Sequence, residues 1–334
     1  MRKHFYWLFI VLLASCIEEP APQLNTVESN FESLWKIIDT RYCYLDYKKI
    51  DWDSIHDVYK LKLPKDSSDE VFFNLMDSML DELKDGHVNL YSDFNISRYW
   101  KWYTDYPANF NSSIIFSSNY LGENYRVAGG MRYGKIDNGR VGYVYYGDFM
   151  SSFYDTNITS IFEYFKNCNG LIIDVRNNGG GSIEYASKLA SYFFAKDTIT
   201  GYMSHKLGDG HSNFSKPTAV KTLAHKSIKW NKPVVVLTNR LSYSATNDFV
   251  CRMKMAPNAT IIGDKTGGGG GLPLSSELPN GWMVRFSACP MYDALMNHTE
   301  WGIEPDSPVN MTDSDIQKNI DTIIESAIIT INNK

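Results

Sequence analysis

The segment Ser242-Tyr243-Ser244-Ala245-Thr246 places hydroxyl side chains directly after an apolar strand pattern and before a helical pattern. A serine at such a turn projects its hydroxyl at the helix N-terminus, where the dipole and the free amides favour developing negative charge. Ser244 is therefore a candidate nucleophile. Taken alone, the pattern is more typical of a helix N-cap, because most serines that precede helices serve as caps.

A glycine-rich turn could supply the complementary chemistry. The segment 174–182, Asp-Val-Arg-Asn-Asn-Gly-Gly-Gly-Ser, joins a buried apolar strand to a helix. Its glycines can turn sharply and leave backbone N–H groups pointing outward at the helix start, which suits an anion. Phosphate loops, oxyanion holes and plain tight turns all use such segments. The GxGxxG order and the GK[ST] ending are both missing, which disfavours a nucleotide.

The third candidate is Asp85-Gly86-His87, at the end of a predicted helix. Histidine suits a base near neutral pH, but the chain has seven histidines and most lone ones are packing or surface residues. A glycine stop before the ring permits its exposure. Nothing more follows from the spacing.

The elements that position these candidates fall into two groups. Phe31, Leu34, Trp35 and Ile38 share one helical face, and a second apolar helical pattern over 71–83 ends at Lys84-Asp85-Gly86. Residues 27–91 are therefore predicted to form a small N-terminal helical domain that carries His87. Residues 92–139 are predicted to be an aromatic, loop-rich connection, whose aromatics are more typical of a core or a domain seam than of a binding surface.

Residues 140–334 are predicted to form an α/β catalytic domain, because strand and helix patterns alternate there. Strands are predicted at 141–146, 171–175, 234–237 and 260–262, helices at 158–165, 183–194 and 245–255, and a closing helix at 313–329. Asn280-Gly281 is a hairpin signal.

The first residues have the pattern of an export signal. Arg2 and Lys3 precede an apolar run over 5–13, and Leu13-Ala14-Ser15-Cys16 resembles the bacterial lipobox. This predicts a signal peptide over 1–15, acylation of Cys16 and a lipidated tether over 16–26. An ordinary secretory signal is the alternative. Both interpretations predict export, and the lipobox predicts membrane anchoring that faces the periplasm or the cell surface.

Composition and charge limit the classes of partner that the chain is expected to bind. The chain has 334 residues, 43% of them hydrophobic, which is enough for a full core and about two domains. A net charge of −5 and scattered basic residues argue against nucleic acid as a partner. The remaining cysteines, Cys43, Cys168, Cys251 and Cys289, lack metal-ligand spacing and could pair or stay as buried thiols. Neither a metal nor a cofactor is predicted.

Together the three candidate segments resemble the C-terminal processing (tail-specific) serine peptidase family. The resemblance lies in Asp174-x-Arg176-x-Asn178-x-Gly180-Gly181, followed after an apolar strand by Ser242-Tyr243-Ser244-Ala245-Thr246 and later by Gly302-Ile303-Glu304-Pro305-Asp306. The resemblance implies a crotonase- and ClpP-like α/β spiral core, a peptide bound as an extended strand, and cleavage near carboxyl termini. The family's nucleophile falls on Ser244, with Ser242 as the runner-up. One oxyanion N–H falls on Ala245 and the other on Gly179 or Gly180.

Two departures from the family pattern concern the base and substrate selection. The position of the family's dyad lysine is held by Gly269, and Lys265, four residues earlier, is expected to be a surface charge. The tricorn-like branch instead uses a histidine from the preceding domain, which implies His87 with an ordinary pKa near 6.5. The span between His87 and Val141 is also too short for a PDZ domain.

In that branch a late glutamate orients the histidine. Glu300 is the nearest match, while the expected position is held by Thr299, and Glu304 could serve instead.

Three functions are therefore compared. The leading one is a serine endopeptidase that acts on exported peptides or proteins through an acyl-enzyme. The second is a catalytically silent lipoprotein that binds peptide tails or apolar ligands on the same fold. A crotonase-like acyl-thioester enzyme is disfavoured by export. The sequence specifies neither the natural substrate nor the oligomeric state.

Overall fold

The computed structural model describes residues 24–65 and 68–334. The predicted signal peptide, Cys16 and most of the predicted tether lie outside the described residues. No helix in the described part of the chain is long and apolar enough to span a bilayer.

The centre of the larger body is a seven-stranded sheet in the order β12-β9-β8-β5-β4-β3-β2. Pairing is parallel from β4 to β12 and antiparallel from β4 to β2. The strands are β2 (Arg126–Ala128), β3 (Met131–Ile136), β4 (Val141–Tyr145), β5 (Gly170–Asp174), β8 (Val234–Thr238), β9 (Ala259–Gly263) and β12 (Ser307–Pro308). The predicted domain boundary at residue 140 therefore falls inside this sheet, which begins at Arg126.

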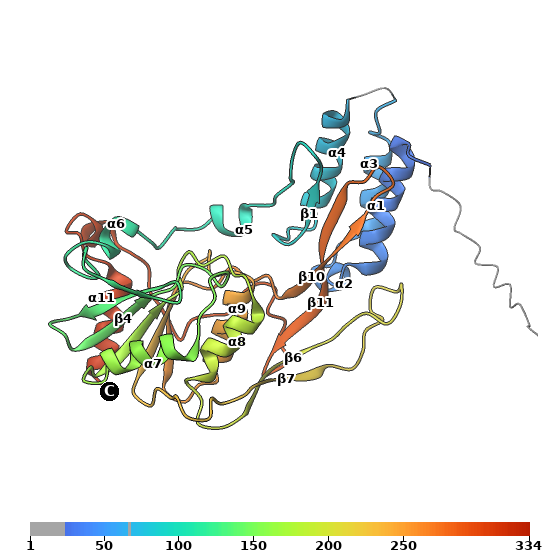
Figure 1. Ribbon diagram of the computed structural model, residues 1–334. Coiled ribbons are helices and arrows are strands. Elements are labelled where there is room, and N and C mark those ends of the chain that lie inside the picture. Colours follow the sequence, from blue (N-terminus) through green and yellow to red (C-terminus); the bar gives the residue numbers. More distant parts are fainter. Residues whose placement is uncertain (1–23, 66–67) are drawn as a thin grey trace, which may run out of the picture.

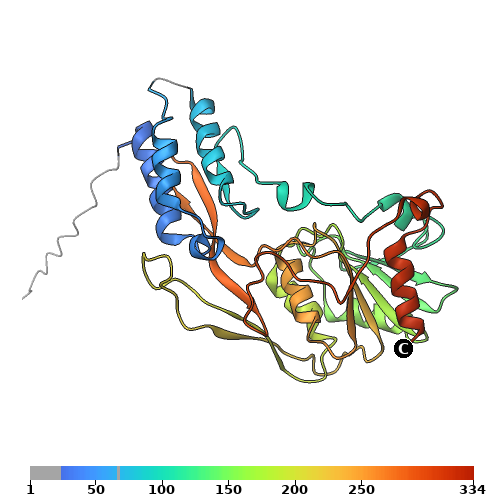
Figure 2. The ribbon, with the colours of Figure 1, turned by 180° about the vertical axis from the view of Figure 1, so that it is seen from behind.

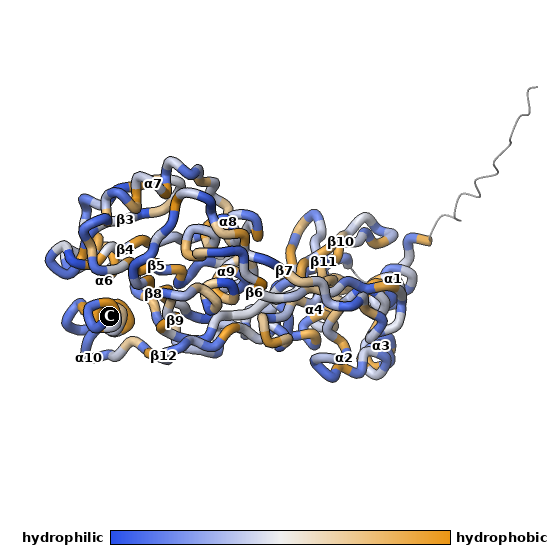
Figure 3. The backbone as a smooth tube through the Cα atoms, turned by 90° about the horizontal axis from the view of Figure 1, so that it is seen from below, coloured by the Kyte–Doolittle hydropathy of each residue, from blue (hydrophilic) through white to orange (hydrophobic). Residues whose placement is uncertain are grey.

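Helices cover both faces of the sheet, and Figure 3 shows α7 and α8 on one side and the C-terminal helix on the other. Neighbouring strand residues enter different cores: Ile173 packs with the α7, α8 and α9 side, and Ile172 with the α11 side. Burial on both faces explains why these strands read as continuous apolar runs. The helices are α7 (Asp155–Tyr164), α8 (Ile183–Ser191), α9 (Ala245–Met253), α10 (Asp313–Ile316) and α11 (Thr322–Asn332).

The N-terminal unit consists of helices with buried apolar faces. These are α1 (Val27–Arg41), α2 (Leu45–Lys48), α3 (Trp52–Lys60) and α4 (Asp69–Asp81), followed by strand β1 (Asn89–Tyr91). Phe31, Leu34 and Ile38 of α1 are fully buried, as their spacing predicts. The unit carries His87 on the short connection between α4 and β1.

A long hairpin connects the N-terminal unit to the larger body. Strands β10 (Gly271–Glu277) and β11 (Met283–Asp293) flank the predicted turn at Asn280-Gly281. Val284 and Phe286 share a core with the N-terminal helices, while Met291 pairs with Met203 of β6 (Thr198–Met203). Figure 1 shows this hairpin rising from the larger body toward α1, α3 and α4. The predicted assignment of all residues after 140 to one catalytic domain is thus too simple.

Other segments also differ from the prediction. The span 92–139 contains α5 (Lys101–Thr104), α6 (Ser112–Ile115), β2 and β3, and Figure 2 shows α5 between the two bodies. Strand β6 pairs with β7 (Thr218–Thr222), and neither was predicted. The closing helix is split because Asn319 adopts a left-handed φ of 59° between α10 and α11. All four cysteines in the described residues are free thiols.

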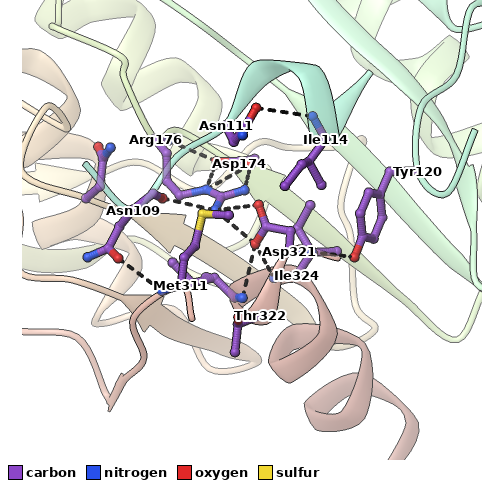
Figure 4. Close-up of polar contacts among 12 residues, drawn as sticks. Asn109, Asn111, Ile114, Tyr120, Asp174, Arg176, Met311, Asp321, Thr322 and Ile324 are labelled. Carbon is purple, nitrogen blue, oxygen red and sulfur yellow. Dashed lines mark hydrogen bonds and ion pairs between the residues drawn. The ribbon is translucent and has the colours of Figure 1, made fainter. Parts of the chain in front are cut away.

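A buried ion cluster fixes the turn after β5 (Figure 4). The Arg176 guanidinium, fully buried, donates to Asp174 at 2.6 Å and to Asp321 at 3.0 Å. Asp321 also caps α11 through the amides of Ile323 and Ile324, so the helix dipole helps to hold its charge. The tyrosine hydroxyl of Tyr143 donates to Asp174 at 2.6 Å. The cluster therefore ties the start of the glycine-rich turn to the C-terminal helix.

We expect Arg176→Met to lower the free energy of unfolding by about 3–5 kcal/mol, because the two carboxylates would stay buried without their cation. Arg140→Met is the matched control, since Arg140 is 56% exposed and forms a surface ion pair with Asp137. Chemical denaturation of both variants measures the difference. Equal, small losses would contradict a structural role for the cluster.

Candidate active site

Ser244 occupies the position before α9 in an unusual backbone conformation, with φ 59° and ψ −119°. Such a conformation costs a non-glycine residue roughly 1–3 kcal/mol and is found where the surrounding structure enforces it. Here the Ser244 N–H donates to the Gly268 carbonyl at 2.9 Å, and the Ser244 carbonyl accepts the Asp248 N–H at 3.0 Å. The hydroxyl makes no capping hydrogen bond to the helix. Ser244 therefore holds the N-cap position of α9, but its side chain does not serve as a cap.

The hydroxyl instead meets His87, which arrives from the N-terminal unit. The distance from Ser244 Oγ to His87 Nε2 is 2.9 Å, so a neutral imidazole can accept the serine proton there. The ring of His87 lies 4.9 Å from the ring of Tyr243, centroid to centroid. Residues 157 positions apart in the chain thus form one polar pair.

Gly86 permits this approach. A Cβ at Gly86 would lie 2.6 Å from Trp102 Nε1 and 2.9 Å from the Tyr243 hydroxyl. Trp102 and Tyr243 are stacked with their ring centroids 4.1 Å apart, and the two rings form a wall that packs against the loop that carries Gly86 and His87. The aromatic segment predicted as a seam contributes Trp102 to this wall, and its neighbour Trp100 is exposed.

Gly179 and Gly180, the alternative oxyanion-hole donors, differ in whether their amides are already hydrogen-bonded. The Gly180 N–H donates to the Asn178 side chain at 3.0 Å, so it is already engaged. The amide of exposed Gly179 has no acceptor among the described residues, and the Ala245 amide starts α9 next to Ser244. Gly180 is needed because it has no side chain: its φ is +102°, and a Cβ there would lie 2.9 Å from Ser244 Cβ.

Asn178 connects the two halves of this arrangement. Its side-chain oxygen accepts from Gly180 N–H and from Thr246 Oγ1 at 2.6 Å, and its amide donates to the Tyr146 carbonyl at 2.9 Å. The glycine-rich turn is thereby fixed to the first turn of the helix that follows the serine.

The other candidates for nucleophile and base are used elsewhere. The Ser242 hydroxyl is fully buried and donates to the Val175 carbonyl at 2.8 Å. Lys265 pairs with Glu304 at 2.8 Å near the surface, as predicted for a surface charge. A Cβ at Gly269 would lie 2.5 Å from Tyr243 Cζ, so a lysine cannot occupy that position in this arrangement.

Comparison with known proteins matches residues 140–309 to Peptidase family S41 and residues 24–81 to the tricorn protease C1 domain. The chain belongs to peptidase family S41. The predicted family resemblance and the α/β core with an N-terminal helical region are thereby confirmed.

Individual S41 relatives differ in how much they share with the chain. It is 50% identical to a candidate peptidase from Parabacteroides merdae, whose crystal structure matches with a TM-score of 0.89 over 92% of this chain and 97% of that one. It is 28% identical to the carboxy-terminal processing protease CtpB of Bacillus subtilis, over 44% of this chain and 29% of that protein. Mature CPAF, 14% identical with a TM-score of 0.68 over 92% of this chain and 98% of that one, shares the fold. The chain spans 29–30% of the length of the first curated relatives it matches.

The predicted acid of this S41 site, Glu300, does not touch His87. Its carboxylate lies 2.7 Å from Lys48 Nζ and accepts the Gly270 N–H at 3.1 Å. The alternatives do not reach His87 either: Glu304 pairs with Lys265, and Thr299 Oγ1 donates to the Met291 carbonyl at 3.3 Å. The expectation of a direct glutamate–histidine contact is therefore not met.

Asp85 is the carboxylate next to His87. It accepts the His87 backbone N–H at 2.8 Å, the hydroxyls of Tyr42 and Ser287 at 2.9 Å each, and lies 3.6 Å from Lys48. Lys48, at the end of α2, thus joins Asp85 and Glu300 in one buried charge cluster. Sequence reasoning missed it because a lysine in a four-residue helix carries no pattern that distinguishes it from the other lysines.

Burial sets the protonation of this cluster. Burial alone raises the pKa of Asp85, but Lys48, His87 and the hydrogen bonds to its carboxylate bring that pKa below its usual value. Burial and the Asp85 charge raise the pKa of Glu300 to about 8, against the effect of Lys48. Near neutral pH one lysine therefore balances one ionised carboxylate.

Burial also lowers the pKa of His87 to about 4, with Arg285 and Lys48 acting in the same direction and Asp85 against them. The expectation of an ordinary value near 6.5 is thus corrected, because His87 is almost fully enclosed. The imidazole is neutral at pH 7. Its Nδ1 atom is buried without a hydrogen-bond partner among the described residues.

Ser244 lies between two hollows. The open cleft on one side is lined by His87, by the glycines 179–181 and by side chains that include Asn89, Tyr99, Trp100, Trp102 and Arg285. A narrower pocket that Ser244 also lines is formed by residues that include Thr200, Val220, Cys251, Leu272 and Met291. In the described residues no group of three or more histidine, cysteine or acidic side chains is arranged to hold a metal ion.

We expect Lys48→Met to destabilise the protein by about 3–5 kcal/mol near pH 8, because Asp85 and Glu300 would lose their shared cation. Both carboxyls would then have raised pKa values in the folded state. Their protonated forms favour folding, so the loss should grow as the pH rises from 5 to 8. Denaturation midpoints across this range measure it, with exposed Lys49→Met as control. A pH-independent loss would contradict the assignment.

Proposed function

We propose that this chain is a serine peptidase that hydrolyses peptide bonds near the carboxyl termini of exported proteins or peptides. The observation that carries the proposal is the 2.9 Å contact between Ser244 Oγ and His87 Nε2, in a cleft that the glycine-rich turn also lines. Membership of family S41 and similarity to the carboxy-terminal processing protease CtpB of B. subtilis support it.

In the proposed reaction the Ser244 oxygen attacks the scissile carbonyl carbon while His87 Nε2 takes the hydroxyl proton. The carbonyl oxygen becomes an oxyanion and accepts hydrogen bonds from the amides of Ala245 and Gly179. His87 then gives its proton to the leaving nitrogen as the C–N bond breaks, which leaves an acyl ester on Ser244. Water repeats the sequence and releases the acid.

The charge cluster has a defined role in this scheme. His87 becomes positive when it takes the proton, although its surroundings disfavour that charge. Asp85, which accepts the backbone N–H of His87, supplies the nearby negative charge that favours the imidazolium. Glu300 acts through Lys48, which lies between it and Asp85. Asp85 and Glu300 are therefore proposed as positioning residues, with Ser244 and His87 as the catalytic pair.

The silent-binding alternative is not favoured. A binding protein needs the cleft but gains nothing from a serine held in a strained conformation against an enclosed, neutral imidazole. A fluorophosphonate reagent separates the two functions, since it labels only an activated serine.

The dyad predicts a specific kinetic pattern. We expect Ser244→Ala and His87→Ala each to lower kcat by about 10⁴-fold or more on a peptide substrate, and the double variant to be little worse, because the two act as one unit. Lys265→Ala should keep full activity. Since His87 accepts a proton only when neutral, kcat/KM should rise with pH through a limb near pH 4 and stay level at pH 7. Full activity of folded His87→Ala would place the base elsewhere.

We further propose that the protein is exported and anchored through Cys16. Support comes from the apolar run that ends at Leu13-Ala14-Ser15-Cys16, a lipobox-like segment.

Cys16→Ser should release the protein from membranes or block its processing, because the residue that is acylated would be lost. Membrane fractionation and mass spectrometry of the mature N-terminus test this, with Cys43→Ser as the control. A mature terminus at another residue would overturn the assignment.

A further inference from the structure

Arg285 is a cationic side chain in the catalytic cleft without a carboxylate partner. It lies on β11, half-buried, and lines the same cleft as Ser244 and His87. Throughout residues 24–65 and 68–334 no Asp or Glu oxygen lies within 4.0 Å of its guanidinium, and its one hydrogen bond is a long one, 3.4 Å to Asn89 Oδ1. The buried arginines Arg176 and Arg252, by contrast, are both paired with aspartates.

The position of Arg285 relative to the dyad follows from the strand register. Arg285 is the direct cross-strand partner of Asn89, which is two residues beyond His87. Two residues of extended chain span roughly 7 Å, and paired strands lie about 5 Å apart, so a long guanidinium side chain reaches the neighbourhood of His87. The effect of the Arg285 charge on the pKa of His87 and of Tyr243 agrees with this proximity.

His87 also defines which side of the cleaved bond Arg285 faces. In acyl transfer the base returns its proton to the leaving amine, so the departing C-terminal segment must lie on the histidine side of the serine. The narrower pocket has a lining that includes Thr200 and Cys251 but not His87, so it is the side for the substrate segment that stays bonded to Ser244 as the acyl group. Arg285 therefore faces the segment that leaves.

Other charges in the cleft do not offer the same site. Arg98 is exposed on the rim, where it donates to the Ile96 carbonyl and lies 5.8 Å from the Trp100 ring. Asp148 lies on the glycine-turn side and accepts the N–H groups of Met150 and Ser151. Of the two arginines that line the cleft, Arg285 is thus the one that is partly buried and has N–H groups free to bind a ligand.

We propose that Arg285 binds the free α-carboxylate of the substrate, so that the site removes a short peptide from a C-terminus. This inference rests on the proposed peptidase function. The planar guanidinium matches a carboxylate with two parallel N–H···O bonds, and partial burial strengthens them. Since extended peptide advances about 3.3 Å per residue, the anchor limits the leaving segment to a few residues. A substrate with a C-terminal amide, or with a long chain beyond the cleaved bond, has no carboxylate charge within reach of Arg285.

The test compares two peptides that differ only in a C-terminal carboxylate or carboxamide. We expect the carboxylate peptide to be cleaved on the order of 10- to 100-fold more efficiently in kcat/KM, mainly through KM, which is typical of one charged hydrogen-bonded contact. Arg285→Gln should abolish this preference, whereas Arg98→Gln should keep it. Removing the Arg285 charge should also move the acid limb of the pH profile to higher pH, because that charge holds the pKa of His87 down.

A binding measurement separates this inference from the proposed function. In Ser244→Ala protein, fluorescently labelled peptides should bind with the same preference for the carboxylate, and the Ser244→Ala, Arg285→Gln double variant should lose it. If the wild type cleaves neither peptide, the proposed peptidase function fails. The binding preference of the Ser244→Ala protein still shows whether Arg285 recognises the carboxylate. Equal or undetectable binding of the two peptides, or an equal loss for both in Arg285→Gln, would overturn the assignment of Arg285.

Discussion

The buried cluster of Asp85, Lys48 and Glu300 is the contact on which the active site depends. Lys48 and Asp85 come from the N-terminal unit, whereas Glu300 follows the hairpin from the larger body, so one lysine holds the two bodies together at the dyad. This contact helps to fix the position of His87 relative to Ser244. A buried charge cluster adds little net stability but penalises every arrangement that separates its members, which makes it suited to fixing a geometry.

The second constraint is strand β11, which belongs to both bodies. Its first residues pair with β1 beside His87, and its last residues pair with β6 in the larger body. A continuous strand transmits position better than a loop, because its backbone hydrogen bonds fix both ends. The serine is fixed separately, by the Gly268 carbonyl and by the Asn178 side chain that holds the glycine-rich turn. The 2.9 Å contact results from both constraints.

Local patterns predicted the parts of the molecule that local energetics determine. The continuous apolar runs of β5 and β8, the period of α1 and the Asn280-Gly281 turn all express a preference within a few residues. The serine and histidine were found because their segments resemble a family. The roles of Lys48 and Arg285 and the low pKa of His87 could not be predicted, because each depends on burial and on at least one neighbour more than a hundred residues away in the chain. Glu300 was proposed by analogy and reaches His87 only through other residues.

Gly269 explains why the base must come from another body. The space that a lysine at position 269 would need is filled by the Tyr243 ring, which stacks on Trp102. The same ring packs against His87, so the residue that excludes a lysine also forms the wall for the imidazole. A base brought in by a separate unit is present only when that unit is docked. In this arrangement the chemistry of Ser244 is therefore coupled to the contact between the two bodies, and a change that loosens the Lys48 cluster weakens the nucleophile without touching it.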